Sequence, residues 1–363
     1  TECRNFVVAG HSGSGKTTLC ELMLFKGGAI PRPGSVDAKN TVSDFMADEQ
    51  EKGSSIYSTV MKCKWKGDEY FFIDTPGYGE FVGEYVAAVR EADAALVVVD
   101  AVDGPQIGTA RAWKLSKQRG IPRFGIVNRL DRERADFKAT LEQMRRNHGK
   151  NVIIPLYWPV GQEANFSRVV NVLFDKDIPS EIAEDVAECR ALWLDAVAET
   201  DDELMMRYLD GEELTDEEIH TGLLKTIKTG RTIPVFAGSS VKDIGITELM
   251  DAIVELFPSP LNYVTVDGAK RKIGEECPPI GIVFKSLNDP FSGQLTFIRT
   301  VSGVFKSDTD VFNLSRSGAK ERFGTLLFMN GKSQTPVKEA GPGAIFAVAK
   351  LKDTHIGDTI SAV

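Results

Sequence analysis

The sequence predicts an α/β domain built on a mostly parallel, doubly wound sheet, followed by a small all-β barrel. Two observations carry this prediction. Over residues 1–130, short apolar runs alternate with helical patterns, which is typical of parallel strands covered by helices on both faces. From Pro278 onward, short runs of β-forming residues are instead separated by turn residues such as Asn330-Gly331.

The first part of the chain supplies the strands of the predicted parallel sheet. We expect buried strands at Asn5–Ala9, Tyr70–Ile73, Ala94–Asp100 and Arg123–Val127. Helices should follow them at Thr17–Lys26, Phe81–Glu91, Thr109–Arg119 and Asp136–Asn147. Because a parallel strand pair needs a crossover connection, usually a helix, this order favours a doubly wound sheet.

Residues 150–230 interrupt that alternation with an acidic, largely helical segment, which we interpret as an insertion within an α/β domain spanning residues 1–262. The expected elements of the insertion are a strand, a long helical region and a helix, at Val152–Val160, Ser180–Leu209 and Asp216–Thr229. The alternation then resumes with a strand and a helix, at Ile233–Ala237 and Ile246–Phe257.

The α/β domain should end at the prolines Pro258 and Pro260, and residues 263–276 are interpreted as a linker. The β domain is then expected to span residues 277–363. Its predicted strands are Ile280–Lys285, Gln294–Val301, Arg322–Phe328 and Ala344–Leu351. Short strands of this kind, separated by turn residues, indicate a barrel or sandwich.

Composition excludes several classes of protein. The chain has 363 residues, of which 42% are hydrophobic and 26% charged, as in globular domains with buried cores. Its apolar runs are far shorter than the roughly 20 residues that span a bilayer, so we expect no membrane partner. The five cysteines form no C-x-x-C pair, which argues against a disulfide framework or zinc site and favours a cytoplasmic location.

The net charge of −9 is concentrated in one segment of the chain. Residues 175–218 contain 17 acidic and 3 basic side chains, which leaves +5 for all other residues. The overall acidity argues against DNA as a partner, whereas the mildly basic remainder is compatible with contact to RNA. We interpret the acidic helices as a solvated face, with a docking surface for a basic protein as the alternative.

A phosphate-binding loop is predicted after the first strand. Gly10-His11-Ser12-Gly13-Ser14-Gly15-Lys16-Thr17 fits the pattern G-x-x-x-x-G-K-[ST] between a strand and a helix. Its glycines let backbone amides converge on phosphate oxygens, and the helix N-terminus adds a favourable dipole. Lys16 should reach the β- and γ-phosphates, and the Thr17 hydroxyl should bind Mg²⁺. The residues expected to bind phosphate are His11, Ser12, Gly13, Ser14, Gly15, Lys16, Thr17 and Thr18.

The segment Asp74-Thr75-Pro76-Gly77 follows the second predicted strand. A carboxylate at a strand end suits a magnesium ligand, usually through water, and the Gly77 amide can contact a γ-phosphate. By itself this pattern more often marks a plain turn. Its position downstream of a phosphate-binding loop makes the functional interpretation the stronger one.

Two further strand-end loops carry residues suited to guanine. In Asn128-Arg129-Leu130-Asp131, the carboxylate can accept two hydrogen bonds from the guanine N1–H and N2 edge, a donor pair that adenine lacks. The alternative is an Asx turn that caps the next helix. In Gly238-Ser239-Ser240-Val241-Lys242, backbone amides can bind guanine O6. The residues expected to contact guanine are Asn128, Arg129, Asp131, Ser239, Ser240 and Val241.

The order of these loops indicates one ligand. Ligands of open α/β sheets bind at the carboxyl ends of the strands, where all four loops fall. A guanine nucleotide, GTP or GDP, bound with Mg²⁺ is the economical explanation. An unrelated P-loop ATPase or kinase is the competing class, and Asp131 argues against it.

At this point the chain resembles the first two domains of bacterial elongation factor G, a translational GTPase, over nearly its whole length. Besides the four loops, four segments carry the resemblance, one of which, Gly357–Ile360, is similar to the end of the family's second domain. Asp48–Ile56 is similar to the family's first switch, E-x-E-R-G-I-T-I, and Asp289–Arg299 to the opening hairpin of its second domain. Phe257–Leu261 is similar to the end of its G domain. The resemblance implies a monomeric, GTP-dependent factor that binds ribosomal RNA and proteins, and it equates residues 150–230 with the G-prime subdomain.

Departures from the family pattern suggest a divergent paralogue. Lys16, Gly77 and the residue at position 78 would take part in catalysis, but Tyr78 stands where the family has the His that positions the attacking water. A phenol can hydrogen-bond a water but does not become a cation. Ser55 replaces a magnesium-binding Thr and keeps its hydroxyl, so the expected metal-site residues are Thr17, Ser55 and Asp74.

Two functions therefore remain open from the sequence. One is an active GTPase coupled to translocation. The other is a ribosome-binding regulator, recycling or rescue factor that hydrolyses GTP slowly, as Tyr78 suggests. The family continues with three further domains, so we expect the chain to be a fragment of a longer factor.

Overall fold

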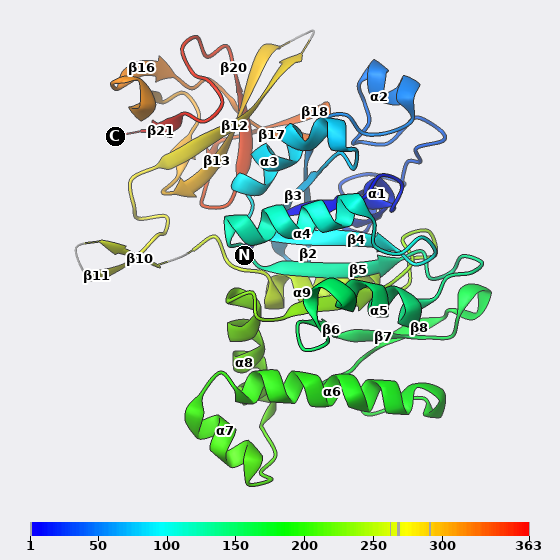
Figure 1. Cartoon of the computed structure of the whole chain (residues 1–363). Helices are drawn as coiled ribbons and strands as arrows, with labels where there is room; N and C mark the ends of the chain where they lie inside the picture. The colour runs from blue at the N-terminus through cyan, green and yellow to red at the C-terminus, as the bar shows by residue number, and fades with distance from the viewer. Residues whose placement is uncertain (1, 262, 267–268, 290–291, 363) are drawn as a thin grey trace.

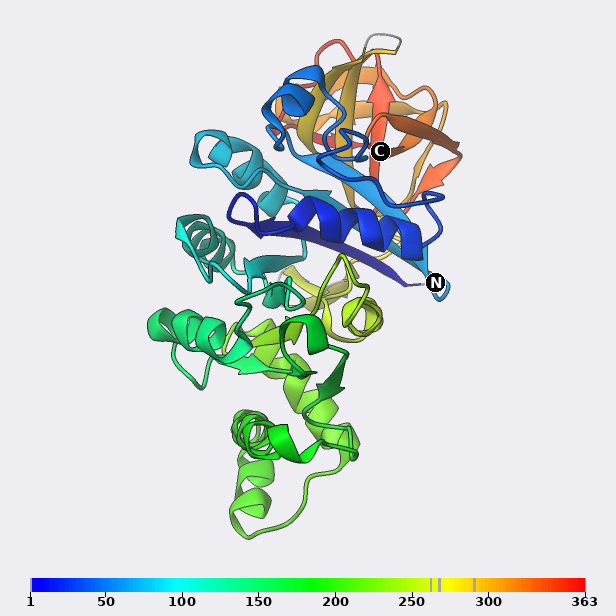
Figure 2. The ribbon, with the colours of Figure 1, turned by 90° about the vertical axis from the view of Figure 1, so that its right-hand side faces the viewer.

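The computed structural model describes residues 2–261, 263–266, 269–289 and 292–362. Figures 1 and 2 show an elongated molecule in which a central α/β sheet separates two ends. The all-β domain lies at one end, and the helices of the 150–230 region lie at the other. None of the described helices is both long and apolar enough to cross a lipid bilayer.

The central sheet has seven strands in the order β2-β3-β1-β4-β5-β9-β6. Their bounds are Cys3–Gly10 (β1), Thr59–Trp65 (β2), Asp68–Asp74 (β3), Ala94–Asp100 (β4), Arg123–Asn128 (β5), Ile153–Pro155 (β6) and Ile233–Ala237 (β9). All neighbours pair in parallel except β2, which runs antiparallel to β3. This confirms the predicted fold class. Strand β2 was not predicted, because Lys62 and Lys64 interrupt its apolar pattern, as suits an edge strand.

Helices cover both faces of this sheet. They are Lys16–Lys26 (α1), Val82–Arg90 (α3), Ile107–Arg119 (α4), Phe137–His148 (α5) and Ile246–Leu256 (α9), with a short 3-10 turn at Gly79–Phe81 (η1). Each helix lies within about two residues of its predicted bounds. The short helix Ala47–Lys52 (α2) was not predicted.

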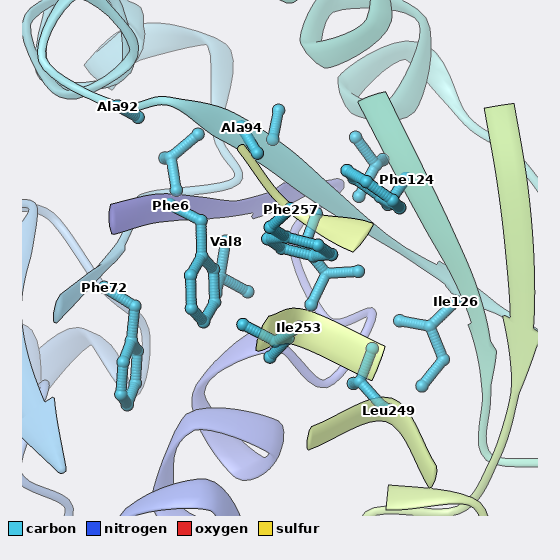
Figure 3. Packing of buried hydrophobic residues seen from close by; sticks show 14 of the residues in the cluster. Phe6, Val8, Phe72, Ala92, Ala94, Phe124, Ile126, Leu249, Ile253 and Phe257 are labelled. Atoms are coloured by element: carbon cyan, nitrogen blue, oxygen red, sulfur yellow. The ribbon is translucent and has the colours of Figure 1, made fainter. Parts of the chain in front are cut away.

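Aromatic rings fill the core between α9 and the sheet (Figure 3). Phe6 on β1 stacks on Phe72 at a centroid distance of 5.4 Å, and Phe124 on β5 stacks on Phe257 at 4.0 Å. Phe257 also meets Phe6 edge-on at 5.3 Å. Such pairs add about 0.5–1.5 kcal/mol each beyond the area they bury, and they fix the strands whose ends carry the predicted loops.

The 150–230 region differs from its prediction in two ways. The single strand expected at Val152–Val160 is two strands: β6 completes the central sheet, and Tyr157–Val160 (β7) pairs with Arg168–Asn171 (β8). The long helical region is interrupted, because Asp201 accepts a hydrogen bond from the Leu204 amide at 3.0 Å and caps a new helix. The helices are Ala183–Ala198 (α6), Asp202–Leu209 (α7) and Asp216–Lys228 (α8), with 3-10 turns at Glu163–Asn165 (η2) and Ser180–Ile182 (η3).

The all-β domain follows a two-stranded hairpin, Tyr263–Val266 (β10) and Ala269–Lys272 (β11). Its main sheet is antiparallel, in the order β16-β15-β21-β12-β13-β20-β17-β18. The strands are Ile280–Asp289 (β12), Gly293–Ser302 (β13), Phe305–Lys306 (β14), Asp310–Asn313 (β15), Ala319–Arg322 (β16), Leu326–Asn330 (β17), Ser333–Val337 (β18), Glu339–Ala340 (β19), Ile345–Ala349 (β20) and Thr359–Ser361 (β21), with a 3-10 turn at Leu314–Arg316 (η4). The strand expected at Arg322–Phe328 is wrong, since the chain leaves the sheet around Gly324 and two strands flank the break.

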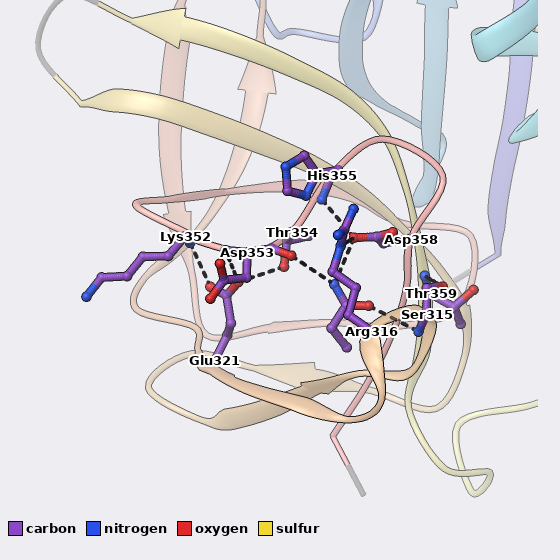
Figure 4. Close-up of polar contacts among 10 residues, drawn as sticks. Ser315, Arg316, Glu321, Lys352, Asp353, Thr354, His355, Asp358 and Thr359 are labelled. Atoms are coloured by element: carbon purple, nitrogen blue, oxygen red, sulfur yellow. Dashed lines mark hydrogen bonds and ion pairs between the residues drawn. The ribbon is translucent and has the colours of Figure 1, made fainter.

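Two carboxylates organise the loop before β21 (Figure 4). Glu321 accepts hydrogen bonds from the Lys352 and Asp353 amides and the Thr354 hydroxyl, at 2.7–3.0 Å. Asp358 accepts from the side chain of Arg316 and the amide of His355, both at 2.9 Å. These contacts attach the loop to β16 and η4, while Leu351 anchors it in the hydrophobic core.

Buried polar side chains are among the groups that join the β domain to the α/β domain. Arg299 on β13 donates to the Glu91 carbonyl and to Asp93 Oδ1, both at 2.6 Å. Asn5 on β1 donates to the Gly343 carbonyl at 3.0 Å. Both contacts use buried side chains, so they set the orientation of one domain on the other.

Candidate functional site

The predicted strand-end loops open onto one cavity of about 490 Å³. Of the residues expected at the site, the cavity is lined by Ser12, Gly13, Gly15, Lys16, Thr17, Thr18, Ser55, Gly77, Tyr78, Asn128, Arg129, Ser240 and Val241. The remaining expected residues, His11, Ser14, Asp74, Asp131 and Ser239, are not among the lining residues; Asp74 hydrogen-bonds to the lining residue Thr17, and Asp131 to Ser239. The sequence missed Ser35, Val36, Asp37, Asp44 and Arg132, which also line it.

Tight backbone packing shapes the phosphate-binding loop. Gly13 and Gly15 have φ values of +81° and +95°, which favour glycine. A Cβ at Gly77 would lie 2.3 Å from the Ser12 amide nitrogen, so the loop after β3 contacts the phosphate-binding loop through backbone alone. Lys16 is buried at the start of α1 and donates to the His11 carbonyl at 2.9 Å. Burial lowers the pKa of Lys16, and an anion in the cavity would offset that cost.

His11 positions the loop rather than lining the cavity. Its Nδ1 accepts a hydrogen bond from the Gly108 amide at 3.3 Å. Partial burial, together with the nearby charges of Lys16 and Arg111, lowers its pKa and favours the neutral ring. A neutral imidazole that accepts at Nδ1 carries its proton at Nε2. His11 therefore links the phosphate-binding loop to the start of α4.

Asp74 lies at the end of β3, fully buried beneath the cavity. Its Oδ2 accepts hydrogen bonds from the Thr17 hydroxyl at 2.8 Å and the Ser43 hydroxyl at 2.7 Å. Its Oδ1 is buried and has no hydrogen-bond partner among the described residues. Burial raises the pKa of Asp74 to about 6. A buried carboxylate with an unused oxygen fits a site that is completed by a cation.

Ser55 extends the same oxygen-rich cluster. Its hydroxyl donates to Asp44 Oδ1 at 2.6 Å and lies 3.4 Å from the Thr17 hydroxyl. Burial raises the pKa of Asp44, whose Oδ2 also lacks a partner within the described part of the chain. Hydroxyl and carboxylate oxygens are the ligands that Mg²⁺ prefers, with water in its remaining positions. Among the described residues, no three His, Cys, Asp or Glu side chains are grouped so that they could bind a metal. A metal in this cavity would therefore also need hydroxyl and water ligands.

Asn128 ties three loops together at the other end of the cavity. Its Oδ1 accepts from the amide and the hydroxyl of Ser240, both at 3.0 Å, and its Nδ2 donates to the Ser14 carbonyl at 3.4 Å. Gly15 is required for this approach, because a Cβ there would lie 2.6 Å from Asn128 Nδ2. Asn128 is buried and engaged by these contacts, so besides lining the cavity it positions the neighbouring loops.

Asp131 and Arg129 are fixed by their own partners. Asp131 Oδ1 accepts from the Ser239 hydroxyl at 2.5 Å. The Arg129 guanidinium donates to the Gly13 carbonyl and to Asp100 Oδ2, the latter at 2.8 Å. Burial acts to raise the pKa of Asp100, but the hydrogen bonds from Arg129 and from backbone amides outweigh it and lower that pKa. The planar Arg129 side chain is thereby set along one wall of the cavity.

Comparison with known proteins agrees with this geometry. Residues 1–259 match the family described as the elongation factor Tu GTP binding domain, and residues 278–363 match elongation factor G domain 2. The chain belongs to the elongation factor G-like translational GTPases. A crystal structure of ttk003000868 from Thermus thermophilus is similar, with 32% identity and a TM-score of 0.88 over 99% of this chain. The chain spans 54% of that protein, about half its length.

In this elongation factor G-like chain, Tyr78 stands at the mouth of the cavity, 41% exposed. The Lys52 ammonium lies 4.9 Å from the centre of its ring and 4.4 Å from that of Phe81. Lys52 ends α2, within the segment that resembles the first switch, and Tyr78 and Phe81 belong to the loop from Asp74 onward, which corresponds to the family's second switch. Cation–π contact therefore joins the two switches beside the cavity. The sequence analysis did not single out Lys52, although it lies within the switch motif.

Two buried glutamates fold residues 34–57, which include the first switch, around the cavity. Glu21 on α1 accepts from the Gly34 amide at 2.7 Å and the Val42 amide at 2.5 Å. Glu49 on α2 accepts from the Ile56 and Tyr57 amides, both at 3.0 Å. Burial raises the pKa of Glu49 to about 7. The only sequence signal for these roles is the acidic residue itself, because its amide partners depend on the tertiary fold.

Proposed function

We propose that the chain binds GTP and GDP with Mg²⁺ in this cavity and acts as the nucleotide-dependent half of a ribosomal translation factor. The observation that carries the proposal is that the four loops meet around one cavity. Groups suited to bind phosphate and a cation lie at one end of it, and Asn128 lies at the other. At one end of this cavity the N-terminus of α1, the buried Lys16 and the buried Asp74 lie together, as a phosphate group with a cation requires.

At the phosphate end, Lys16 and the backbone amides from His11 to Thr18 would bind the phosphate oxygens. Thr17, Ser55 and Asp74 would bind Mg²⁺, directly or through water, and Gly77 would offer its amide to the γ-phosphate. The metal, when bound, neutralises charge on the phosphates. The buried oxygens of Asp74 and Asp44 without partners among the described residues support this assignment.

At the base end, Asp131 would select guanine through the N1–H and N2 edge. Asn128, Ser239, Ser240, Val241 and Arg129 would complete the base pocket. A fluorescent GDP analogue displaced by GTP and GDP, but not by ATP, is the expected result. Asp131→Asn should weaken GDP binding by about 10- to 100-fold, because a donor replaces a charged acceptor. Equal displacement by ATP would favour the competing ATPase or kinase class.

We further infer that GTP hydrolysis is slow. Tyr78 supplies a phenol where a water-positioning imidazole is expected, and its ring is engaged by Lys52. Phosphate release by the full-length protein, measured with and without ribosomes, tests this. Tyr78→His should increase the rate. Turnover typical of an active translocase, with no gain in the variant, would instead support the first alternative, an active GTPase coupled to translocation.

We also propose a cytoplasmic location and a ribosomal partner, and the charge distribution supports the partner. The acidic helices α6 and α7 lie at the end of the molecule opposite the β domain (Figure 1). Residues 263–363 carry 13 basic and 10 acidic side chains, so the β domain would face ribosomal RNA and the insertion would face away or toward basic protein. Charge reversal within residues 175–218 should leave RNA-dependent binding intact. A loss of ribosome binding with an altered salt slope would assign the insertion a docking role.

A further inference from the structure

A buried lysine of the β domain contacts the chain just after the first switch. Lys285 on β12 donates from its ammonium to the Ser58 carbonyl at 2.6 Å, and lies 3.5 Å from Glu84 Oε2. Ser58 ends the segment that we call the switch segment, residues 41–58. A lysine is rarely fully buried without a compensating partner, and here the partner lies in the other domain.

Glu84 on α3 completes a three-way contact. Its Oε2 accepts from the Ser58 amide and the Ser58 hydroxyl, both at 2.8 Å. Burial acts to raise the pKa of Glu84, but Lys285 and Ser58 outweigh it and lower that pKa. Burial also lowers the pKa of Lys285, opposed by the charge of Glu84. The end of the switch segment is thus fixed between a charged group of the β domain and one of the α/β domain.

The start of the switch segment meets the β domain as well. Gly331, in the turn between β17 and β18, has a φ of +56°, and a Cβ there would lie 2.2 Å from the Val42 carbonyl. The Gly331 amide also donates to the Val60 carbonyl at 3.3 Å. Figures 1 and 2 show α2, inside the segment, lying against this side of the β domain.

Close packing joins these two contacts. Phe45 and Met46 of the switch segment and Leu287 and Phe297 of the β domain line a common cavity of only about 10 Å³. Space of this size holds at most about one water molecule. The segment therefore lies on the β domain along its length, while Asp44 and Ser55 face the nucleotide cavity on its other side.

We propose that Lys285 is a positioning residue of the nucleotide site: together with Gly331, it fixes both ends of the switch segment so that Asp44 and Ser55 stay beside Thr17. This inference rests on the proposed function, because it assigns the β domain a role in nucleotide and magnesium binding. If the switch segment is ordered in only a fraction of the molecules, the apparent affinity for nucleotide is reduced by that fraction. By keeping the segment ordered, the β domain would prevent this loss of affinity, and nucleotide binding would in return stabilise the contact between the domains.

The test compares three variants of the full-length protein. Lys285→Met removes the ammonium but keeps the stem, and Gly331→Ala disturbs the other end of the segment. Arg299→Met is the matched control, because Arg299 is also a buried cation that contacts the α/β domain, but at Glu91 and Asp93 rather than at the segment. Thermal unfolding confirms that each variant is folded. If Lys285→Met does not fold, Gly331→Ala decides.

The primary readouts are the dissociation rate of a fluorescent GDP analogue and the Mg²⁺ concentration at half-maximal binding. Lys285→Met and Gly331→Ala should each raise both by about 5- to 20-fold, whereas Arg299→Met should leave the Mg²⁺ dependence unchanged. Unchanged values in the first two variants would overturn the proposal. So would an equal change in all three, which would mean that the contact only stabilises the domain arrangement.

Hydrogen exchange without nucleotide separates this inference from the proposed function. The amides of Val42, Ile56 and Tyr57 donate to buried glutamates in the folded segment. They should exchange faster in Lys285→Met and at the native rate in Arg299→Met. If the unaltered protein binds no guanine nucleotide, the proposed function fails while this exchange result still reports whether Lys285 orders the segment. Native exchange rates in Lys285→Met would overturn the inference.

Discussion

The two halves of the nucleotide cavity are built in different ways. The half made by the phosphate-binding loop is built mainly on backbone fixed to the central sheet, with glycines at the points of close approach and Lys16 and Thr17 at the start of α1. The other half is made by the switch segment, residues 41–58. It consists of the side chains of Asp44 and Ser55, and the segment itself contacts buried glutamates and the β domain. The geometry of a backbone site is fixed once the sheet has folded, whereas the geometry of a side-chain site also depends on the contacts that hold its segment in place. The switch half is therefore the one whose geometry pH, Mg²⁺ and the neighbouring domain can alter.

The largest effect is expected in the phosphate-binding half. Lys16→Met removes a buried cation at the start of α1 and should weaken GDP binding by up to about 100-fold, since hydrogen bonds to charged groups are worth about 1.5–3 kcal/mol. Equilibrium titration of a fluorescent GDP analogue measures this. Lys114→Met, an exposed lysine on α4, is the control. Unchanged binding in Lys16→Met would place the phosphates elsewhere.

The sequence predicted the first half far better than the second. Gly13, Gly15, Lys16 and Thr17 are local to one strand–loop–helix unit, so their spacing carries their geometry. Asp44 gave no such signal, because it reaches the cavity only when Glu21 and the β domain fold the segment around it. For the same reason the sequence misplaced a strand at Gly324, where the break in the strand depends on long-range pairing.

A second prediction concerns Asp74, which both halves share. Its pKa is raised to about 6 in the folded chain, from about 3.9 when unfolded. A carboxyl whose pKa is raised favours folding at low pH and loses that contribution as the pH rises through 6. Without nucleotide or Mg²⁺, Asp74→Asn should therefore stabilise the chain at pH 7.5 by about 2–3 kcal/mol.

Urea unfolding at two pH values measures this effect. The gain from Asp74→Asn should shrink to a small fraction near pH 4, where the native carboxyl is protonated in the folded state and about half protonated in the unfolded one. The variant should also lose the Mg²⁺ dependence of nucleotide binding. Asp177→Asn, at an exposed aspartate in the insertion, is the matched control. An equal gain at both pH values would mean that burial of charge is not the cause.

The smallest effect is expected where the switches meet. Lys52 contacts the rings of Tyr78 and Phe81, and a partly exposed cation–π contact is worth about 0.5–1 kcal/mol. A double-mutant cycle of Lys52→Met and Phe81→Leu, followed by urea unfolding, should give a coupling free energy of that size. Tyr78→Phe, which keeps the ring and removes only the hydroxyl, should leave the effect of Lys52→Met unchanged. A coupling free energy near zero, or one that depends on the Tyr78 hydroxyl, would mean that the rings do not join the two switches. The β domain would then be the main support of the switch half.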